Sequence, residues 1–165
     1  MAFTLKVSAF LIGGEKLENL TTKELLRSKE EKRILTGKIS GIEDEYYKLK
    51  GEKISCAIVW YGGIKVLIPC THLGIEKINK SMIRGMLGAE IDFIVIEIDS
   101  TSNIAIASRK DAMILRSQIE FQKLKENDVV RVRILAVGVK HIIVELYGKE
   151  IIIKADNLQH TYIVN

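Results

Sequence analysis

The stretch Leu87–Ala112, LGAEIDFIVIEIDSTSNIAIASRKDA, decides the fold, because it contains two apolar runs, a polar turn and an abrupt charged end. The runs 90–98 and 103–108 are rich in Ile and Val, which favour strands. The polar residues between them are typical of a tight turn. Ser108 is placed to cap a following helix, with Asp111 three residues later. This stretch therefore predicts two closing strands of a β unit and the start of a helix.

The residues before this stretch predict three more strands. Alternation of apolar and polar residues indicates strands at 34–42, 54–61 and 64–69, with Gly62-Gly63 as a hairpin turn. A polar loop is expected at 43–52, and a short helical or irregular crossing at 81–87. Five short strands with a crossing between the third and fourth favour a small closed barrel of the oligonucleotide/oligosaccharide-binding type. A generic small sandwich is the alternative.

The residues after this stretch predict a linker and a second β unit. The segment 109–127 has no Gly or Pro and is predicted to be helical, and strands follow at 129–137, 141–146 and 149–155. TGKISGI (36–42) aligns with RVRILAV (131–137) at an offset of 95, and GIKVLIPCTHL (63–73) aligns with GKEIIIKADNL (148–158) at an offset of 85. The difference of 10 is the length of the loop 43–52, so the second unit repeats the first without that loop.

These patterns divide the chain into four parts. Residues 1–33 hold a strand-like arm (3–12) and a helix, residues 34–108 the first barrel, residues 109–127 the helical linker, and residues 128–165 a second, incomplete unit of the same type. With three strands, the second unit would leave apolar edges open. Two explanations stay open: either the chain is part of a longer protein, or other strands complete the unit, from the N-terminal arm or from a second copy of the chain in a homodimer.

Composition limits the class of protein. The 165 residues are 47% apolar and carry a net charge of +4. Residues 109–165 hold 10 basic and 7 acidic groups, so most of the net positive charge lies there. This charge permits binding to a polyanion. Cys56 and Cys70 lie in apolar runs without metal-ligand spacing, and no signal peptide or membrane-spanning segment is expected. The chain is therefore expected to be cytoplasmic, with no membrane partner.

No pattern of residues indicates catalysis. The sequence has no nucleophile–base constellation, no phosphate-binding Gly-rich loop and no metal-ligand set, so we expect neither an enzyme, nor a cofactor, nor a metal. Glu90, Asp92, Glu97 and Asp99 are interpreted as charges on the barrel rim.

The sequence resembles the S-one RNA-binding repeat, named for ribosomal small-subunit protein one. The likeness lies in LTGKISGI (35–42), in GIKVLIPCTHL (63–73), in the stretch 87–112 quoted above, and in LKENDVVRVRILAV (124–137), which is similar to the start of a further repeat. It covers about residues 34–165. The resemblance implies a non-catalytic barrel that binds single-stranded RNA or mRNA in translation or mRNA handling, with the ribosome as a further candidate partner.

Binding of this kind uses rings on which bases stack and cations that follow the phosphates. Trp60 and Tyr61 are the candidate stacking rings, and His72 is a candidate polar contact. The candidate cations of the first unit are Lys38, Lys53 and Lys65, and those of the second are Arg131, Arg133, Lys140 and Lys149. The resemblance adds Arg109 and Lys110, because the family places basic residues near RNA at this exit from the barrel.

The sequence departs from the family pattern at the stacking positions. The family phenylalanine before Ile-Pro is Leu67 here and Ile152 in the second unit, and the aromatic run of the second strand is Ser55-Cys56-Ala57-Ile58. These departures favour an alternative function, a protein-interaction module that docks on the ribosome or on another RNA-associated protein.

Overall fold

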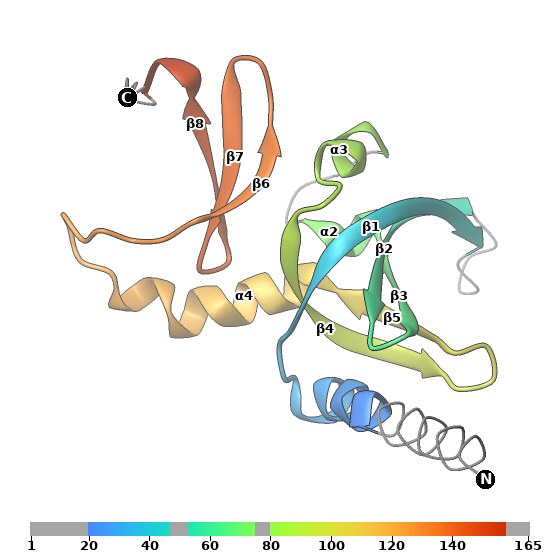
Figure 1. Cartoon of the computed structure of the whole chain (residues 1–165). Coiled ribbons are helices and arrows are strands. Elements are labelled where there is room, and N and C mark those ends of the chain that lie inside the picture. The colour runs from blue at the N-terminus through green and yellow to red at the C-terminus, as the bar shows by residue number, and fades with distance from the viewer. Residues whose placement is uncertain (1–19, 47–52, 75–79, 158–165) are drawn as a thin grey trace, which may run out of the picture.

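The computed structural model describes residues 20–46, 53–74 and 80–157, and these residues are mainly β (Figure 1). Five strands form a closed barrel: β1 (Leu35–Tyr46), β2 (Lys53–Tyr61), β3 (Ile64–Pro69), β4 (Glu90–Asp99) and β5 (Ile104–Ser108). Around the barrel the order is β1-β2-β3-β5-β4, and β4 returns to β1. The pair β3–β5 is parallel, and the other neighbours are antiparallel.

The barrel interior is filled by the apolar side chains that alternate along each strand. Successive residues of a strand point to opposite sides, so Ala57 and Val59 of β2 face inward while Ile58 and Trp60 face outward. Residues 20–31 form a helix whose Leu25 is buried in the same core. Its Ser28 hydroxyl accepts a hydrogen bond from the Val95 amide at 3.0 Å, which fixes the helix against β4.

Short helical segments connect the strands. Between β3 and β4 lie α2 (Cys70–Leu73), which was not predicted, and α3 (Lys80–Gly85), which overlaps the crossing predicted at 81–87. After β5, α4 (Arg109–Ile119) and a 3-10 turn, η1 (Phe121–Lys123), lead away from the barrel. The Ser108 hydroxyl accepts a hydrogen bond from the Asp111 amide at 3.0 Å, so the predicted cap of this helix is confirmed. The helix ends at Ile119, whereas the linker was predicted to be helical as far as residue 127.

A separate three-stranded sheet follows, made of β6 (Arg133–Val137), β7 (His141–Leu146) and β8 (Lys149–Lys154), and it ends in a 3-10 turn, η2 (Ala155–Asn157). Figure 1 shows this sheet outside the barrel, reached through α4. Its register repeats that of β1-β2-β3. Ile39 pairs with Val59 and Ile134 pairs with Val144, and a bulge follows both Ile39 and Ile134. The two sheets therefore share their pairing register at the offsets of 95 and 85.

Two predicted strand boundaries are wrong. The strand expected at 34–42 continues to Tyr46, because pairing between β1 and β2 extends to Tyr46 and Lys53 into the predicted loop. The strand expected at 129–137 begins only at Arg133, where pairing with Glu145 of β7 begins. The N-terminal strand expected at 3–12 lies outside the described residues.

Candidate nucleic-acid interface

The outer face of β2 and β3 carries aliphatic side chains where the resemblance implies rings. Ile58 lies opposite Leu67, and Cys56 lies opposite Pro69. Cys56, Ile58 and Leu67 form a small apolar cluster against Ile104 of β5. All three are buried. This part of the face therefore offers no aromatic surface to a base.

Trp60 and Tyr61, the two predicted stacking rings, lie on opposite faces of β2. Trp60 is 59% exposed and lies on the outer face opposite Lys65. Tyr61 faces the core, where its ring meets Phe93 edge to face at 6.0 Å, and its hydroxyl donates to Glu24 Oε2 at 2.8 Å. Burial, followed by the hydrogen bond to Glu24, raises the pKa of Tyr61 to about 12. Trp60 is thus the ring available to a ligand, and the predicted role of Tyr61 is corrected to packing.

The predicted cations of the first unit have different surroundings. Lys65 lies beside Trp60 and forms an ion pair with Glu43 of β1. Lys38 is exposed and is the register partner of Glu90, on the side of the barrel where β1 meets β4. Lys53 begins β2, and its side chain lies outside the described residues. Of the three, Lys65 is the cation that shares the outer face of β2 and β3 with Trp60.

Arg109 is wrongly predicted as an RNA contact. Its side chain is fully buried, and it donates to the Leu73 carbonyl at 2.7 Å, to Glu150 Oε1 at 2.7 Å and to Glu145 Oε2 at 2.6 Å. It therefore joins the barrel end to β7 and β8. Lys110, the next residue of α4, is half-buried, as is His72 in α2. Both remain candidates.

Arg133 also belongs to a structural ion cluster. The carboxylate of Asp92 in β4 is buried, and it accepts from Thr36 Oγ1 at 2.7 Å, from Arg133 Nη1 at 2.6 Å and from Arg116 of α4. Arg133 further approaches Glu90, with 3.8 Å between Nε and Oε1. The interpretation of Asp92 as a rim charge is wrong, and Arg133 is corrected from an RNA contact to a structural partner of this buried charge.

The remaining predicted cations of the second unit are exposed. Arg131 and Lys140 lie in the segments before β6 and β7. Lys149 begins β8, and its ammonium lies 5.9 Å from the ring centre of Phe121, in the range of a cation–π contact. Of the four predicted cations of the second unit, Arg133 thus differs from the others, because it turns toward the barrel.

The ion clusters around Arg109 and Asp92 were missed in the sequence. One signal was present: Glu145 and Glu150 interrupt otherwise apolar strands, and at the repeat offset they replace Trp60 and Lys65. An isolated charge in an apolar strand requires a partner when it is buried. The pattern does not identify Arg109 as that partner, because the contact joins two units of the fold.

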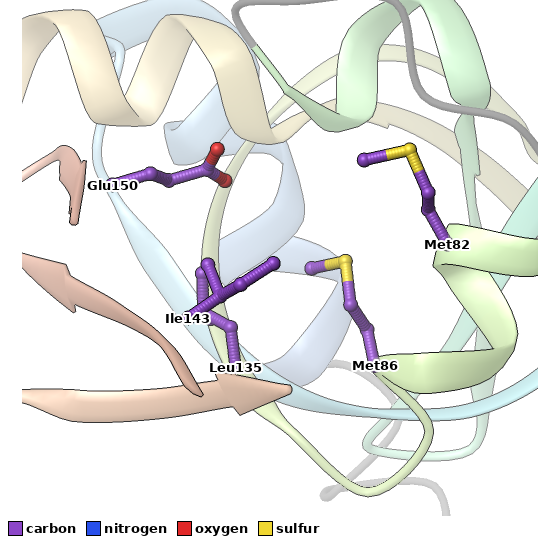
Figure 2. A pocket seen from close by; sticks show the side chains of 5 residues that line it. All are labelled: Met82, Met86, Leu135, Ile143 and Glu150. Carbon is purple, nitrogen blue, oxygen red and sulfur yellow. The ribbon is translucent and has the colours of Figure 1, made fainter. Parts of the chain in front are cut away.

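A small cavity lies beside these clusters, between α3 and the three-stranded sheet. Its volume is about 80 Å³, and it is lined by Met82, Met86, Leu135, Ile143 and Glu150. Figure 2 shows Met86 extending from the turn after α3 toward Leu135 and Ile143. The cavity is mostly apolar, and its one carboxylate already binds Arg109, so we regard it as part of the junction between the units.

The comparisons with known proteins identify no relative: no protein-family model and no curated protein matches the chain. Within the described residues, no helix is both long and apolar enough to cross a membrane. In the same residues, no three His, Cys, Asp or Glu side chains come together in a way that could hold a metal ion.

Proposed function

We propose that the barrel is an S-one-type oligonucleotide/oligosaccharide-binding fold that binds single-stranded RNA without catalysing a reaction. The closed order β1-β2-β3-β5-β4 with a parallel β3–β5 pair supports the fold assignment. Binding to unstructured mRNA in the cytoplasm, during translation or mRNA handling and in contact with the ribosome, is the role that this proposal implies.

The exposed ring of Trp60 carries this proposal. A large aromatic ring that is 59% exposed on a barrel face, with Lys65 opposite it, combines a stacking surface with a nearby positive charge. Any base can stack on such a ring, and the interaction contributes about 1–3 kcal/mol per base. Lys38, Lys110, Arg131 and Lys140 are the candidates for phosphate contacts farther along a bound strand.

Intrinsic fluorescence tests the proposal directly, because Trp60 is the only tryptophan of the chain. Titration with a short oligouridine at low salt should quench its emission and raise the anisotropy of a labelled RNA. Trp60→Ala should weaken binding by about 5- to 150-fold, the equivalent of about 1–3 kcal/mol. Binding should also weaken as salt rises, because phosphate neutralisation releases counterions.

A matched variant locates the binding surface. Phe121 is also partly exposed but lies in η1, outside the barrel, so Phe121→Ala should leave RNA affinity unchanged. If Phe121→Ala weakens binding and Trp60→Ala does not, RNA binds the second unit near Lys149 instead. If wild-type protein binds no RNA at low salt, the proposal is wrong.

A second function, a protein-interaction module, is favoured by one observation. The aliphatic cluster of Cys56, Ile58 and Leu67 replaces the rings, and Lys65 is paired with Glu43. Because the cluster is buried, the exposed ring of Trp60 is the apolar group that this face offers to a partner protein. Partners captured by the chain would then survive nuclease treatment, and Trp60→Ala would change their binding while RNA leaves Trp60 emission unchanged.

A further inference from the structure

The two units of the repeat differ in which positions of the same three-stranded structure are exposed. At the repeat offsets, the outward residues Ile58, Trp60 and Lys65 of the barrel correspond to Ile143, Glu145 and Glu150. Ile143 packs against the barrel core, and both glutamates bind Arg109. The barrel therefore covers this face of the second unit around Glu145, whereas Ile152 on the same face, the counterpart of Leu67, stays 68% exposed.

The opposite face of the second unit corresponds to a barrel interior. Ile39 of β1 is 1% exposed, whereas its counterpart Ile134 of β6 is 56% exposed. Val66 of β3 is 0% exposed, whereas its counterpart Ile151 of β8 is 38% exposed. Val144 on the central strand is buried. The exposed apolar side chains thus lie on the two edge strands of this sheet.

In the first unit, the equivalent face is covered by the strands β4 and β5. There β4 pairs antiparallel with Leu35–Lys38 of β1, and β5 pairs parallel with Lys65–Leu67 of β3. The equivalent positions are 130–133 and Glu150–Ile152. Residues 130–132 lie outside β6, although the sequence pattern predicts a strand there, and among the described residues no strand pairs with them. Residues 130–132, which would pair with a strand equivalent to β4, therefore do not form a strand themselves.

We propose that the exposed face of β6-β7-β8 is a docking site for an amphipathic β-hairpin of a partner protein, which completes a second five-stranded barrel. The first strand of the hairpin pairs antiparallel with residues 130–133, and the second pairs parallel with Glu150–Ile152. Its inner side chains are apolar and cover Ile134 and Ile151. This is strand addition at an open sheet edge.

The charges around the site indicate an acidic outer side for this hairpin. In the first barrel, Asp92 of β4 lies opposite Thr36, and Thr36 corresponds to Arg131 in the repeat. Arg131 is exposed, and Lys140 and Lys154 at the ends of the sheet are exposed as well. A carboxylate at the position equivalent to Asp92 would lie beside the Arg131 guanidinium.

The chain's own β4-β5 hairpin serves as the probe. A spacer and a second copy of residues 90–108 are appended to the full chain. The spacer is chosen so that the segment from the end of β8 to the appended copy is as long as the segment from Pro69 to Glu90. Amide hydrogen exchange at residues 130–133 and 150–152 should slow at least tenfold relative to the unmodified chain. A control fusion carries Phe93→Asp and Ala105→Asp in the appended copy alone, and it should give no protection.

Three results would overturn the proposal. The first is a fusion that protects neither edge, or a control that protects both equally. The second is an unmodified chain that sediments as a dimer with β6 already protected, which would assign the face to a second copy. The third is an unmodified monomer with both edges already protected, which would assign it to the chain itself. None of these depends on RNA binding, so the proposed function is tested separately.

Discussion

The sheets β1-β2-β3 and β6-β7-β8 share strand order, hairpin register and bulge position, yet equivalent positions such as Trp60 and Glu145, or Ile39 and Ile134, differ in burial. In the barrel, the side of Ile39 is covered and the side of Trp60 faces solvent. In the second unit, the side of Glu145 is covered and the side of Ile134 faces solvent. Backbone pairing therefore does not decide which face is buried.

Two residue exchanges explain why Trp60 is exposed and its counterpart Glu145 is buried. Where the first unit has Trp60 and Lys65, the second has Glu145 and Glu150, and both carboxylates receive hydrogen bonds from Arg109. The guanidinium is planar and can serve several acceptors at once, which suits it to a buried junction. A face that could contact a ligand in one unit has become an intramolecular contact in the other.

The strongest test of this comparison removes the contact that covers the second sheet. Arg109→Ala leaves the buried Glu145 without its partner, so we expect a loss of about 3–5 kcal/mol in the free energy of unfolding. Urea denaturation followed by circular dichroism measures it. The neighbouring Lys110→Ala should change stability by less than about 0.5 kcal/mol. Equal effects of the two variants would show that the Arg109 cluster does not hold the units together.

Two substitutions at equivalent positions compare the apolar faces of the two units. Ile39→Ala opens a cavity in a closed core and should cost about 2–5 kcal/mol. Ile134→Ala, at the equivalent position, removes an exposed side chain and should cost less than about 1 kcal/mol. The same denaturation measurement applies. If both variants lose the same amount, the inner face of the second unit is already covered in solution.

The two hairpin turns differ in what lies beside them. Gly63 and Gly148 are equivalent, and both have positive φ, at 88° and 79°. A Cβ at Gly63 would meet no atom within 4 Å, so Gly63→Ala should cost only backbone strain, about 1 kcal/mol. At Gly148 it would lie 2.0 Å from the Met113 carbonyl oxygen of α4.

Gly148→Ala should therefore lose about 1–3 kcal/mol more than Gly63→Ala, because the β7-β8 turn must move away from α4. Thermal unfolding of the two variants measures the difference. Equal midpoints would mean that the turn does not rest on the helix.

The sequence predicted the barrel strands and the repeat because both depend on local alternation and on turn residues such as Gly62-Gly63. It failed where a contact between units decides the outcome. The pattern at 129–132 favours a strand, but a strand also needs a partner, and β6 begins only at Arg133. Arg109 has the sequence context of an exposed helix start, and its burial depends on Glu145 and Glu150 from a separate sheet. Trp60 and Tyr61 were both predicted as stacking rings, but adjacent strand residues face opposite ways, so only Trp60 of the two lies on the outer face.

The smallest effect concerns Tyr61, whose counterpart in the second unit is Leu146 and has no hydroxyl. Tyr61→Phe removes the hydrogen bond to Glu24 and should cost about 0.5–1.5 kcal/mol at neutral pH. The pKa of Tyr61 is raised from 10.0 to about 12, so the folded state favours the neutral phenol. This contribution to stability is complete below pH 10 and is lost as the pH rises through about 12.

Ultraviolet titration of tyrosinate absorbance follows that ionisation. Wild-type protein should show one step near pH 12 that Tyr61→Phe removes, whereas Tyr147→Phe, in the turn of the second unit, should leave this step in place. A wild-type titration complete near pH 10 would mean that the Tyr61 hydroxyl is not held by Glu24. The link between the barrel and the helix over residues 20–31, which the second unit lacks among its described residues, would then rest on the Ser28–Val95 hydrogen bond and on apolar contacts such as those of Leu25.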